Sequence, residues 1–285
     1  MQHPHLQRER MRFAFLVSQM LGYQIPDLFC TNESFVEFEK ALKLLRENGF
    51  EGVELNLNLD DDQLLARIGK ALDKSELKLA AVGTGMLYAI EKLSFTDSNP
   101  SKRFEAVSRV TKLIRFAAQH QAIVIIGLVR GTGSIESKEN VTALRECLRA
   151  CDTEASNCDG KIALEAINRY ETKSLNTAEQ VAEFIDDSRL NATGILLDTF
   201  HMNIEERSIE STIRSYVDRL VHFHIADSNR WPPGYGHLHI REELKILADL
   251  NYQGWVSAET LPRPSNIDSV VSTASYLTKC NLRRG

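Results

Sequence analysis

The segment IALEAINRYE, residues 162–171, is a short apolar run that ends in a metal-capable side chain and then turns polar. Three later segments repeat this form: GILLDTFHMN (194–203), VHFHIADSNR (221–230) and WVSAET (255–260). Short apolar or β-branched runs bounded by polar residues are typical of buried strands. The runs follow one another about thirty residues apart, which leaves room for a crossover helix between each pair, as a parallel sheet requires.

The same alternation of strand-like and helix-like patterns extends along the chain. Expected strands cover residues 13–18, 52–56, 79–83, 122–128, 161–166, 194–197, 220–226 and 255–259. Between them lie stretches with apolar residues at helical spacing, including 34–50, 103–121, 176–189, 209–220 and 268–280. Strands that alternate with helices in this way favour a parallel sheet covered by its crossover helices.

These units predict an α/β fold in which the sheet closes as a (β/α)8 TIM barrel. The length of 285 residues suits such a barrel, and the GxGxxG fingerprint of an open dinucleotide-binding sheet does not follow the first strand. Because no linker or low-complexity tract marks a boundary, we expect a single TIM-barrel domain over residues 1–285. The longest irregular stretches, 21–33, 86–101 and 228–239, follow predicted strands, where barrel enzymes carry their active-site loops.

Metal-capable side chains stand at the ends of the last four predicted strands. They are Glu165, Asp198, His224 and Glu259. One glutamate at a strand end is more often solvated or salt-bridged than a ligand, but the carboxyl ends of barrel strands converge on one mouth, so these four become neighbours. Three carboxylates and one imidazole suit a borderline-hard cation. We expect one divalent metal ion, with Mn²⁺ favoured and Co²⁺, Mg²⁺ or Zn²⁺ as alternatives.

Composition and charge argue against several other classes of protein. The formal net charge of -5 and the pI near 5.9 do not fit a nucleic-acid-binding surface. The first twenty residues contain no small-residue cleavage site and no apolar span of membrane length. Five scattered cysteines without a CxxC pair do not resemble a disulfide framework or a zinc ribbon. We therefore expect a cytoplasmic protein that acts on a small molecule, with no nucleic-acid or membrane partner.

Four segments resemble the xylose isomerase-like barrel superfamily of sugar isomerases and epimerases, and within it the D-tagatose/D-allulose (psicose) 3-epimerase branch. They are LEAINRYE (164–171), LLDTFHMNIEE (196–206), HFHIADSNRWPPGYGH (222–237) and VSAET (256–260). Carried over residue by residue, the resemblance implies that the four residues at the strand ends bind the metal. It also implies that Glu171, His201 and Arg230 contact the sugar, and that the protein is a homodimer or homotetramer.

The residue types also permit epimerisation beside a ketone through a cis-enediolate. A C–H bond next to a carbonyl becomes acidic enough for a side-chain base when a divalent ion stabilises the developing charge. Inversion then requires one group to remove the proton and another to return one on the opposite face. Glu165 and Glu259 arrive from non-adjacent predicted strands on two sides of the metal. We expect them to be the catalytic pair of a metal-dependent ketose 3-epimerase.

Each predicted sugar contact has a simpler interpretation. His201 fits a loop histidine in solvent. Arg230 fits a surface ion pair with Asp227 or another nearby carboxylate, although its guanidinium also suits the oxygens of a sugar. Glu171 fits a solvated loop carboxylate, and only the resemblance favours a substrate contact there.

The remaining histidines of the third segment are expected outside the ligand set. His222 lies two residues before His224 and therefore points to the same side of its strand. We expect His222 in the core or behind the ligands. His237 and His239 follow a proline- and glycine-rich run, and we expect them at the surface of a loop.

The first half of the chain departs from the 3-epimerases and leaves the substrate open. The segment VIIGLVRGTGS, residues 124–134, places Arg130 beside glycine-rich backbone at the end of the fourth predicted strand. Arg130 is a candidate to hold a phosphate or carboxylate group of the substrate. Pairing with a carboxylate at the barrel mouth is an equally good interpretation. In the first case the substrate is a sugar phosphate or a sugar acid and not a free ketose.

Three other functions fit part of the pattern. A sugar-phosphate, hydroxypyruvate or inosose isomerase of the same superfamily would exchange a proton at the aldehyde-adjacent carbon. An endonuclease IV-like DNA-repair enzyme needs a three-zinc cluster, and the first four predicted strands have almost no histidine at their ends. A non-catalytic sugar-binding barrel would keep its ligand in a Glu→Gln variant and would have no turnover to lose.

Overall fold

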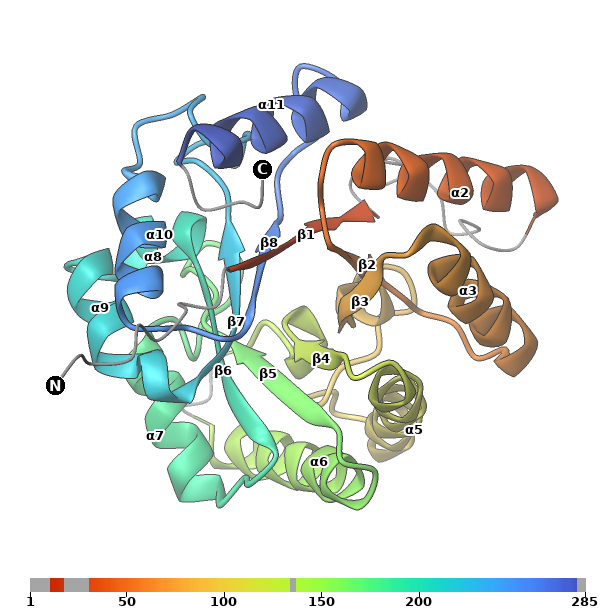
Figure 1. Ribbon diagram of the computed structural model, residues 1–285. Helices are drawn as coiled ribbons and strands as arrows, with labels where there is room; N and C mark the ends of the chain where they lie inside the picture. The colour runs from red at the N-terminus through yellow and green to blue at the C-terminus, as the bar shows by residue number, and fades with distance from the viewer. Residues whose placement is uncertain (1–10, 18–30, 134–136, 281–285) are drawn as a thin grey trace, which may run out of the picture.

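Eight parallel strands close into a barrel in the computed structural model of the protein, which describes residues 11–17, 31–133 and 137–280. The strands are β1 Arg12–Leu16, β2 Gly52–Asn56, β3 Lys78–Gly83, β4 Ile123–Ile126, β5 Lys161–Glu165, β6 Thr193–Asp198, β7 Leu220–Ile225 and β8 Trp255–Ala258. Each strand pairs with the next along the chain, and β8 pairs with β1. Figure 1 shows this closure, with red β1 beside blue β8. The predicted (β/α)8 TIM barrel is confirmed.

Helices follow the strands, and most of them surround the barrel on its outer side (Figure 1). They are α2 Asn32–Glu47, α3 Asp62–Ser75, α4 Gly85–Ala89, α5 Pro100–Gln119, α6 Lys138–Asn157, α7 Ala178–Ser188, α8 Thr199–Glu205, α9 Ile209–Tyr216, α10 Ile240–Asp249 and α11 Asn266–Lys279. Short 3₁₀ turns cover Leu128–Arg130 (η1) and Val217–Arg219 (η2). Two helices differ from the sequence prediction, because α4 begins the stretch expected to be irregular and α8 follows β6 directly. Residues 18 and 21–30 of the expected first strand and loop lie outside the described residues.

Successive side chains of each strand point alternately into the barrel and toward the surrounding helices, and they pack in two different clusters. In β5, Ile162 and Leu164 belong to the large core cluster that includes the helix faces, whereas Ala163 belongs to a small cluster with residues of β3, β4 and β6. Successive side chains of a strand point to opposite sides. Glu165 therefore shares the inward direction of Ala163, at the carboxyl end of the barrel. This alternation makes a polar side chain at a strand end face the mouth.

A side-chain cap and one buried carboxylate fix local structure away from the mouth. Thr31 accepts a hydrogen bond from an amide in the first turn of α2, a contact that contributes about 1 kcal/mol. Asp152 of α6 is 5% exposed. Its carboxylate accepts from the amides of Asn191 and Ala192, both at 2.9 Å, and from Thr193 Oγ1 at 2.6 Å. Asp152 thus ties α6 to the amino end of β6.

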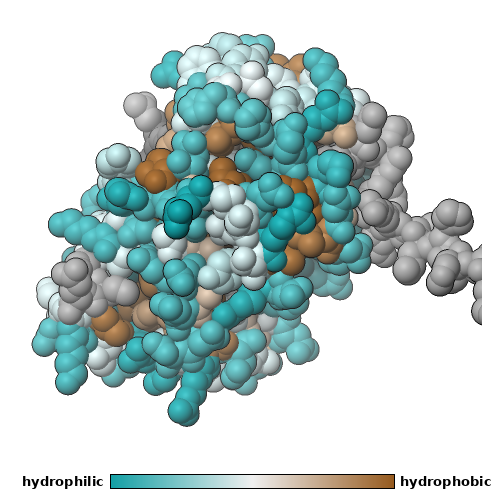
Figure 2. Space-filling view, turned by 90° about the vertical axis from the view of Figure 1, so that its left-hand side faces the viewer, coloured by the Kyte–Doolittle hydropathy of each residue, from teal (hydrophilic) through white to brown (hydrophobic). Residues whose placement is uncertain are grey.

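The side of the protein that α7, α9 and α10 cover is mainly polar. Figure 2 shows the side covered by α7, α9 and α10, where hydrophilic residues surround several separate hydrophobic patches. Within the part of the chain that the structure describes, no helix combines the length and the apolar character needed to cross a membrane. The cysteines at positions 147, 151, 158 and 280 are free thiols.

Candidate metal and substrate site

The four predicted ligands converge at the carboxyl end of the barrel. In chain order they end, or lie beside the ends of, β5 to β8: Glu165, Asp198, His224 and Glu259. Each residue offers one possible ligand atom, and these four atoms all lie within 4.8 Å of one another. From His224 Nδ1 the distance is 3.1 Å to Glu259 Oε2, 3.8 Å to Asp198 Oδ2 and 3.9 Å to Glu165 Oε1. The structure brings together the set that the sequence predicts.

Burial and mutual repulsion favour a cation in this cluster. Burial, with the nearby Glu259 carboxylate, raises the pKa of Glu165 to about 8. Burial also raises the pKa of Asp198 to about 6, although the Arg230 guanidinium acts in the opposite direction. At Glu259 burial disfavours the charged form, but Arg230 and His224 together lower the pKa to about 2. Carboxylates crowded in a low-dielectric site repel one another, so positive charge among them is favourable.

Two buried polar atoms of the cluster face charged groups of the site but make no well-aligned hydrogen bond among the described residues. They are Asp198 Oδ2 and His224 Nδ1. Asp198 uses its other oxygen, Oδ1, to accept from the Phe200 amide at 2.6 Å, and so forms the N-cap of α8. A buried polar atom without a partner costs about 1–3 kcal/mol. A divalent ion would satisfy both atoms, and three carboxylates with one imidazole are a suitable donor set for it.

A cavity of about 260 Å³ opens at this cluster. Its charged and polar wall comes from β5 to β8 and their loops, and includes Glu165, Glu171, His201, His224, Arg230 and Glu259. The wall contributed by β2, β3 and β4 carries mainly uncharged side chains, including Asn56, Thr84, Met86 and Leu128, and its one charged side chain among the described residues is Glu54 of β2. The volume lies just below the usual range for ligand pockets, about 300–1,000 Å³. The cavity therefore suits a small polar molecule.

The loop after β7 presents Arg230 to the cavity. Asp227 is buried at the start of this loop, and its carboxylate accepts from the amides of Gly234 at 2.8 Å and Leu238 at 3.1 Å. Arg230 has a φ of 60°, a left-handed conformation that costs a non-glycine residue about 1–2 kcal/mol. The hydrogen bonds to Asp227 stabilise the loop in this shape. The backbone of the loop thus sets the direction of the Arg230 side chain.

The guanidinium of Arg230 contacts the cluster and not Asp227. Its Nη2 donates to Glu259 Oε2 at 2.8 Å and lies 4.0 Å from Asp198 Oδ2. Its Nη1 lies 3.6 Å from Glu171 Oε1. Arg230 and Glu171 both line the cavity, as the expected sugar contacts would.

His201 lies in α8 with one ring nitrogen toward the cavity, and only 2% of the residue is exposed. The side-chain amide of Asn168 donates to Glu171 Oε1 at 3.0 Å, and its nitrogen also lies 2.7 Å from His201 Nδ1. Because that amide nitrogen is a donor, Nδ1 accepts and the proton of the neutral ring lies on Nε2. Nε2 lies 3.6 Å from Glu165 Oε1 and 3.5 Å from Arg230 Nη1, and both distances are too long for a strong hydrogen bond. Burial and the Arg230 charge lower the pKa of His201 well below its ordinary value, so the ring is a neutral donor.

Arg130 is the predicted substrate contact that the structure does not bring to the cavity. The side chain is 1% exposed. Its guanidinium donates to the backbone carbonyl of Glu165, to that of Ser174 at 3.1 Å and to that of Leu175 at 3.3 Å. These bonds join η1 to the end of β5 and to the loop after it. The contacts are those of a structural arginine, and they do not support a role in holding a phosphate.

The structure adds a residue that the sequence analysis did not select. Glu54 of β2 is 1% exposed and lines the cavity beneath the cluster. Its carboxylate contacts His222 and His224 at hydrogen-bond distance. His222 is fully buried behind the ligands, where the sequence placed it, whereas His237 and His239 are exposed. The sequence signal for Glu54 is its position between a valine and a leucine in a predicted strand.

Comparison with known proteins places the chain among sugar epimerases. The family model described as "Xylose isomerase-like TIM barrel" matches residues 42–280. D-psicose 3-epimerase of Enterocloster bolteae is 44% identical over 251 residues, which cover 82% of this chain and 80% of that protein. D-psicose 3-epimerase of Ruminiclostridium cellulolyticum is 30% identical over 200 residues, which cover 66% and 68%. L-ribulose 3-epimerase of Methylomonas sp. is 27% identical, with coverage of 78% and 77%.

Solved structures of such proteins share the fold. A structure of L-ribulose 3-epimerase superposes with a TM-score of 0.81 at 20% identity and covers 95% of this chain and 94% of its own. The structure of D-psicose 3-epimerase with D-tagatose from Clostridium cellulolyticum gives a TM-score of 0.76 at 21% identity, with coverage of 96% and 100%. The identity and the matched family model, taken with the convergent carboxylates, show that the chain belongs to the xylose isomerase-like TIM barrel family, among its isomerase-class ketose 3-epimerases.

Proposed function

We propose that the chain is a metal-dependent epimerase that inverts C3 of a free ketose. The observation that carries this proposal is the placement of Glu165 and Glu259 in one cavity, on strands β5 and β8, with Asp198 and His224 on the strands between them. Two carboxylates that approach from separated strands are able to address the two faces of one substrate carbon. The similarity to D-psicose 3-epimerase supports the same reaction class.

The reaction needs one carboxylate to take the C3 proton and another to deliver a proton to the opposite face, through a cis-enediolate. Glu165 and Glu259 are the proposed pair. His201 donates from Nε2 to an oxygen of the substrate. Arg230 and Glu171 hold hydroxyl groups at the cavity wall and fix the sugar relative to the pair.

Glu165, Asp198, His224 and Glu259 are the proposed ligands of one divalent ion, and the donor set favours Mn²⁺ over softer ions. When bound, the ion stabilises the negative charge that develops on the substrate oxygens. The charge distribution of the cavity favours an unphosphorylated sugar. Arg230 is the one lysine or arginine among the described residues that line it, and this side chain already faces Glu259 and Glu171.

An exchange experiment in D₂O tests this function. Free ketohexoses and ketopentoses incubated with the protein and Mn²⁺ are expected to acquire deuterium at C3 and to give the C3 epimer. NMR locates the label. Label at the carbon next to an aldehyde would instead indicate an aldose–ketose isomerase. Exchange only with phosphorylated ketoses, or no exchange with any ketose, would contradict the proposal.

Replacing Gly127 by alanine is expected to lower kcat, and any change in Tm is measured beside it. A Cβ atom at this position would lie 2.8 Å from Glu165 Oε2, so the free end of that side chain must move. Displacing a reacting group by about 1 Å costs up to about 10²-fold in rate. Steady-state kinetics and a thermal melt measure the two effects. Gly133→Ala is the matched control, since the nearest atom to a Cβ at that position would be Asn140 Nδ2 at 3.7 Å. Wild-type kcat in Gly127→Ala would contradict the expectation.

The proposal extends to the setting of the enzyme. A cytoplasmic location agrees with the free thiols of the four described cysteines. The expected homodimer or homotetramer stays a prediction that light scattering of the purified protein tests.

A further inference from the structure

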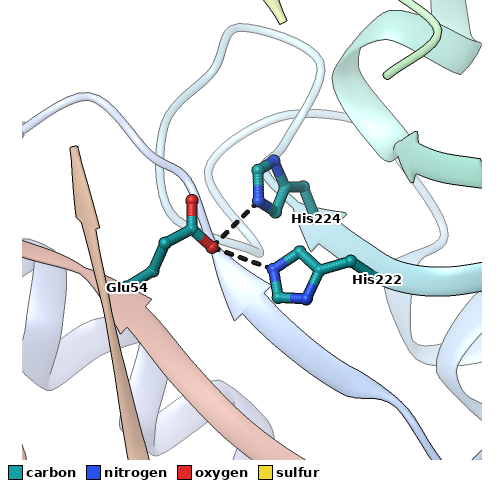
Figure 3. A group of neighbouring side chains, drawn as sticks. All are labelled: Glu54, His222 and His224. Carbon is teal, nitrogen blue, oxygen red and sulfur yellow. Dashed lines mark hydrogen bonds and ion pairs between the residues drawn. The ribbon is translucent and has the colours of Figure 1, made fainter. Parts of the chain in front are cut away.

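Glu54 and His222 form a buried group with the proposed ligand His224. Figure 3 shows the carboxylate, which comes from β2, facing both imidazole rings of β7. Glu54 Oε2 lies 2.9 Å from His222 Nε2 and 3.0 Å from His224 Nε2. The three side chains are 0–2% exposed, so water does not compete for these contacts. An ionised carboxylate only accepts hydrogen bonds, so each ring donates from Nε2.

The bond to Glu54 determines which nitrogen of His224 faces the metal cluster. With a proton held on Nε2, the lone pair available for a cation lies on Nδ1. Nδ1 is the atom that stands 3.1 Å from Glu259 Oε2 and 3.8 Å from Asp198 Oδ2. Histidines that bind a metal through one nitrogen commonly donate from the other to a carboxylate, which fixes the tautomer and the ring orientation. Glu54 has the position and the chemistry of such a partner.

His222 holds Glu54 in turn. Its ring packs edge-on against that of His224, with centroids 5.0 Å apart and planes at 81°. The two rings donate to the same carboxylate oxygen from neighbouring inward positions of one strand. Rotation of the Glu54 side chain would break both bonds together, which restricts the carboxylate to one orientation.

The same three residues also have the spacing of a second metal group. The hydrogen bonds already account for both Nε2 atoms and for Glu54 Oε2, so no cation is needed to explain the contacts. The two interpretations differ in the number of ions bound. A hydrogen-bonded group predicts one divalent ion per chain, whereas a second metal group predicts two.

We propose that Glu54 is a positioning residue that accepts from His224 Nε2, is held by His222, and thereby aims His224 Nδ1 at the cation. This inference rests on the proposed function and its metal site, and it adds a partner on the far side of the barrel interior. It assigns β2 a part in a site whose ligands all come from β5 to β8.

Metal affinity of the full-length protein tests the inference without any assay of turnover. Calorimetric titration of the metal-free protein with Mn²⁺ gives Kd and the number of ions. Loss of a carboxylate behind a ligand typically weakens metal binding about 10–100-fold. We expect Glu54→Leu near the upper end of that range and Glu54→Gln, which keeps an acceptor oxygen, near the lower end. Visible absorption of the Co²⁺ form is expected to change in both variants, because it reports ligand geometry.

Asp152→Asn is the matched control, because Asp152 is also a buried carboxylate that accepts three hydrogen bonds but lies at the amino end of β6. This variant is expected to lower Tm while leaving the Mn²⁺ Kd and the Co²⁺ spectrum unchanged. If Glu54→Leu does not fold, Glu54→Gln alone decides the matter. Wild-type Kd in the folded Glu54 variants, or two ions per wild-type chain, would overturn the proposal.

The outcomes separate this inference from the proposed function. If the wild type binds one Mn²⁺ and the Glu54 variants bind it more weakly, the inference holds even when no ketose is epimerised. If the wild type epimerises ketoses and the variants keep its Kd, the inference fails while the function stands. A wild type that binds no divalent ion would overturn both.

Discussion

Glu165→Gln and Glu259→Gln are each expected to lower kcat for epimerisation about 10²- to 10⁴-fold, the range that positioned acid–base groups supply. Glutamine keeps the shape and an acceptor oxygen, so the Arg230 bond to position 259 retains a partner. It cannot take up a proton from carbon. Conversion of the ketose, followed by chromatography, gives kcat. Circular dichroism and a thermal melt show whether each variant folds.

Loss of metal binding alone would also reduce turnover, so it must be distinguished from loss of proton transfer. Asp198→Asn is the control, because Asp198 is a proposed ligand without a proposed proton-transfer role. Its Oδ1 can still accept from the Phe200 amide and cap α8. Saturating Mn²⁺ is expected to restore much of the activity of Asp198→Asn and little of the activity of the two glutamate variants. Full restoration of either glutamate variant by excess metal would remove it from the catalytic pair.

Removal of the divalent ion is expected to abolish turnover and to lower Tm by about 5–10 °C. An ion present at about 100 times its Kd stabilises the folded state by about 2.7 kcal/mol, and each kcal/mol shifts the Tm of a domain of about 150–250 residues by about 2–4 °C. The physical reason lies in the cluster, where burial and the Glu259 charge raise the pKa of Glu165 to about 8. Treatment with a chelator, followed by dialysis, produces the metal-free protein.

Adding a divalent ion back to the metal-free protein is the second half of that experiment. Adding Mn²⁺ or Co²⁺ back is expected to return both turnover and Tm, whereas Ca²⁺, which prefers more oxygen ligands and longer bonds, is expected to return less turnover. Asp198→Asn serves here too, since its Tm is expected to respond less to added metal at the same concentration. Undiminished turnover after exhaustive chelation, with metal content checked by mass spectrometry, would exclude the proposed role of the ion.

The fold and the ligand set could be predicted because both depend on patterns local to each strand. A run such as IALE shows by its composition that it is a buried strand and by its last residue that it presents a carboxylate. The closed ring then follows from eight such units, and the convergence of Glu165 with Glu259 follows from the ring. No contact between distant residues had to be known in advance.

The roles of Glu54 and Arg130 depend on such distant contacts. Glu54 meets His222 and His224 across 168 and 170 positions of sequence, and only closure of the barrel brings β2 opposite β7. Arg130 stood beside glycines in the sequence, as an anion-binding arginine often does. In the structure its N–H groups instead donate hydrogen bonds to backbone carbonyls of the loop after β5. A local pattern identifies what a side chain can do, but the fold decides which partner it meets.

The contact between Arg230 and Glu259 has a consequence for the valence of the ion. The three carboxylates of the cluster carry three negative charges when ionised, and Arg230 at 2.8 Å from one of them returns one positive charge. Glu54, which contacts His224 from β2, adds a fourth buried carboxylate. Arg230 therefore cancels only part of the negative charge in a site with little water to screen the remainder. A cation of charge two neutralises more of that remainder than a monovalent ion such as Na⁺, and the arginine lowers the charge that the ion must neutralise without ligating it.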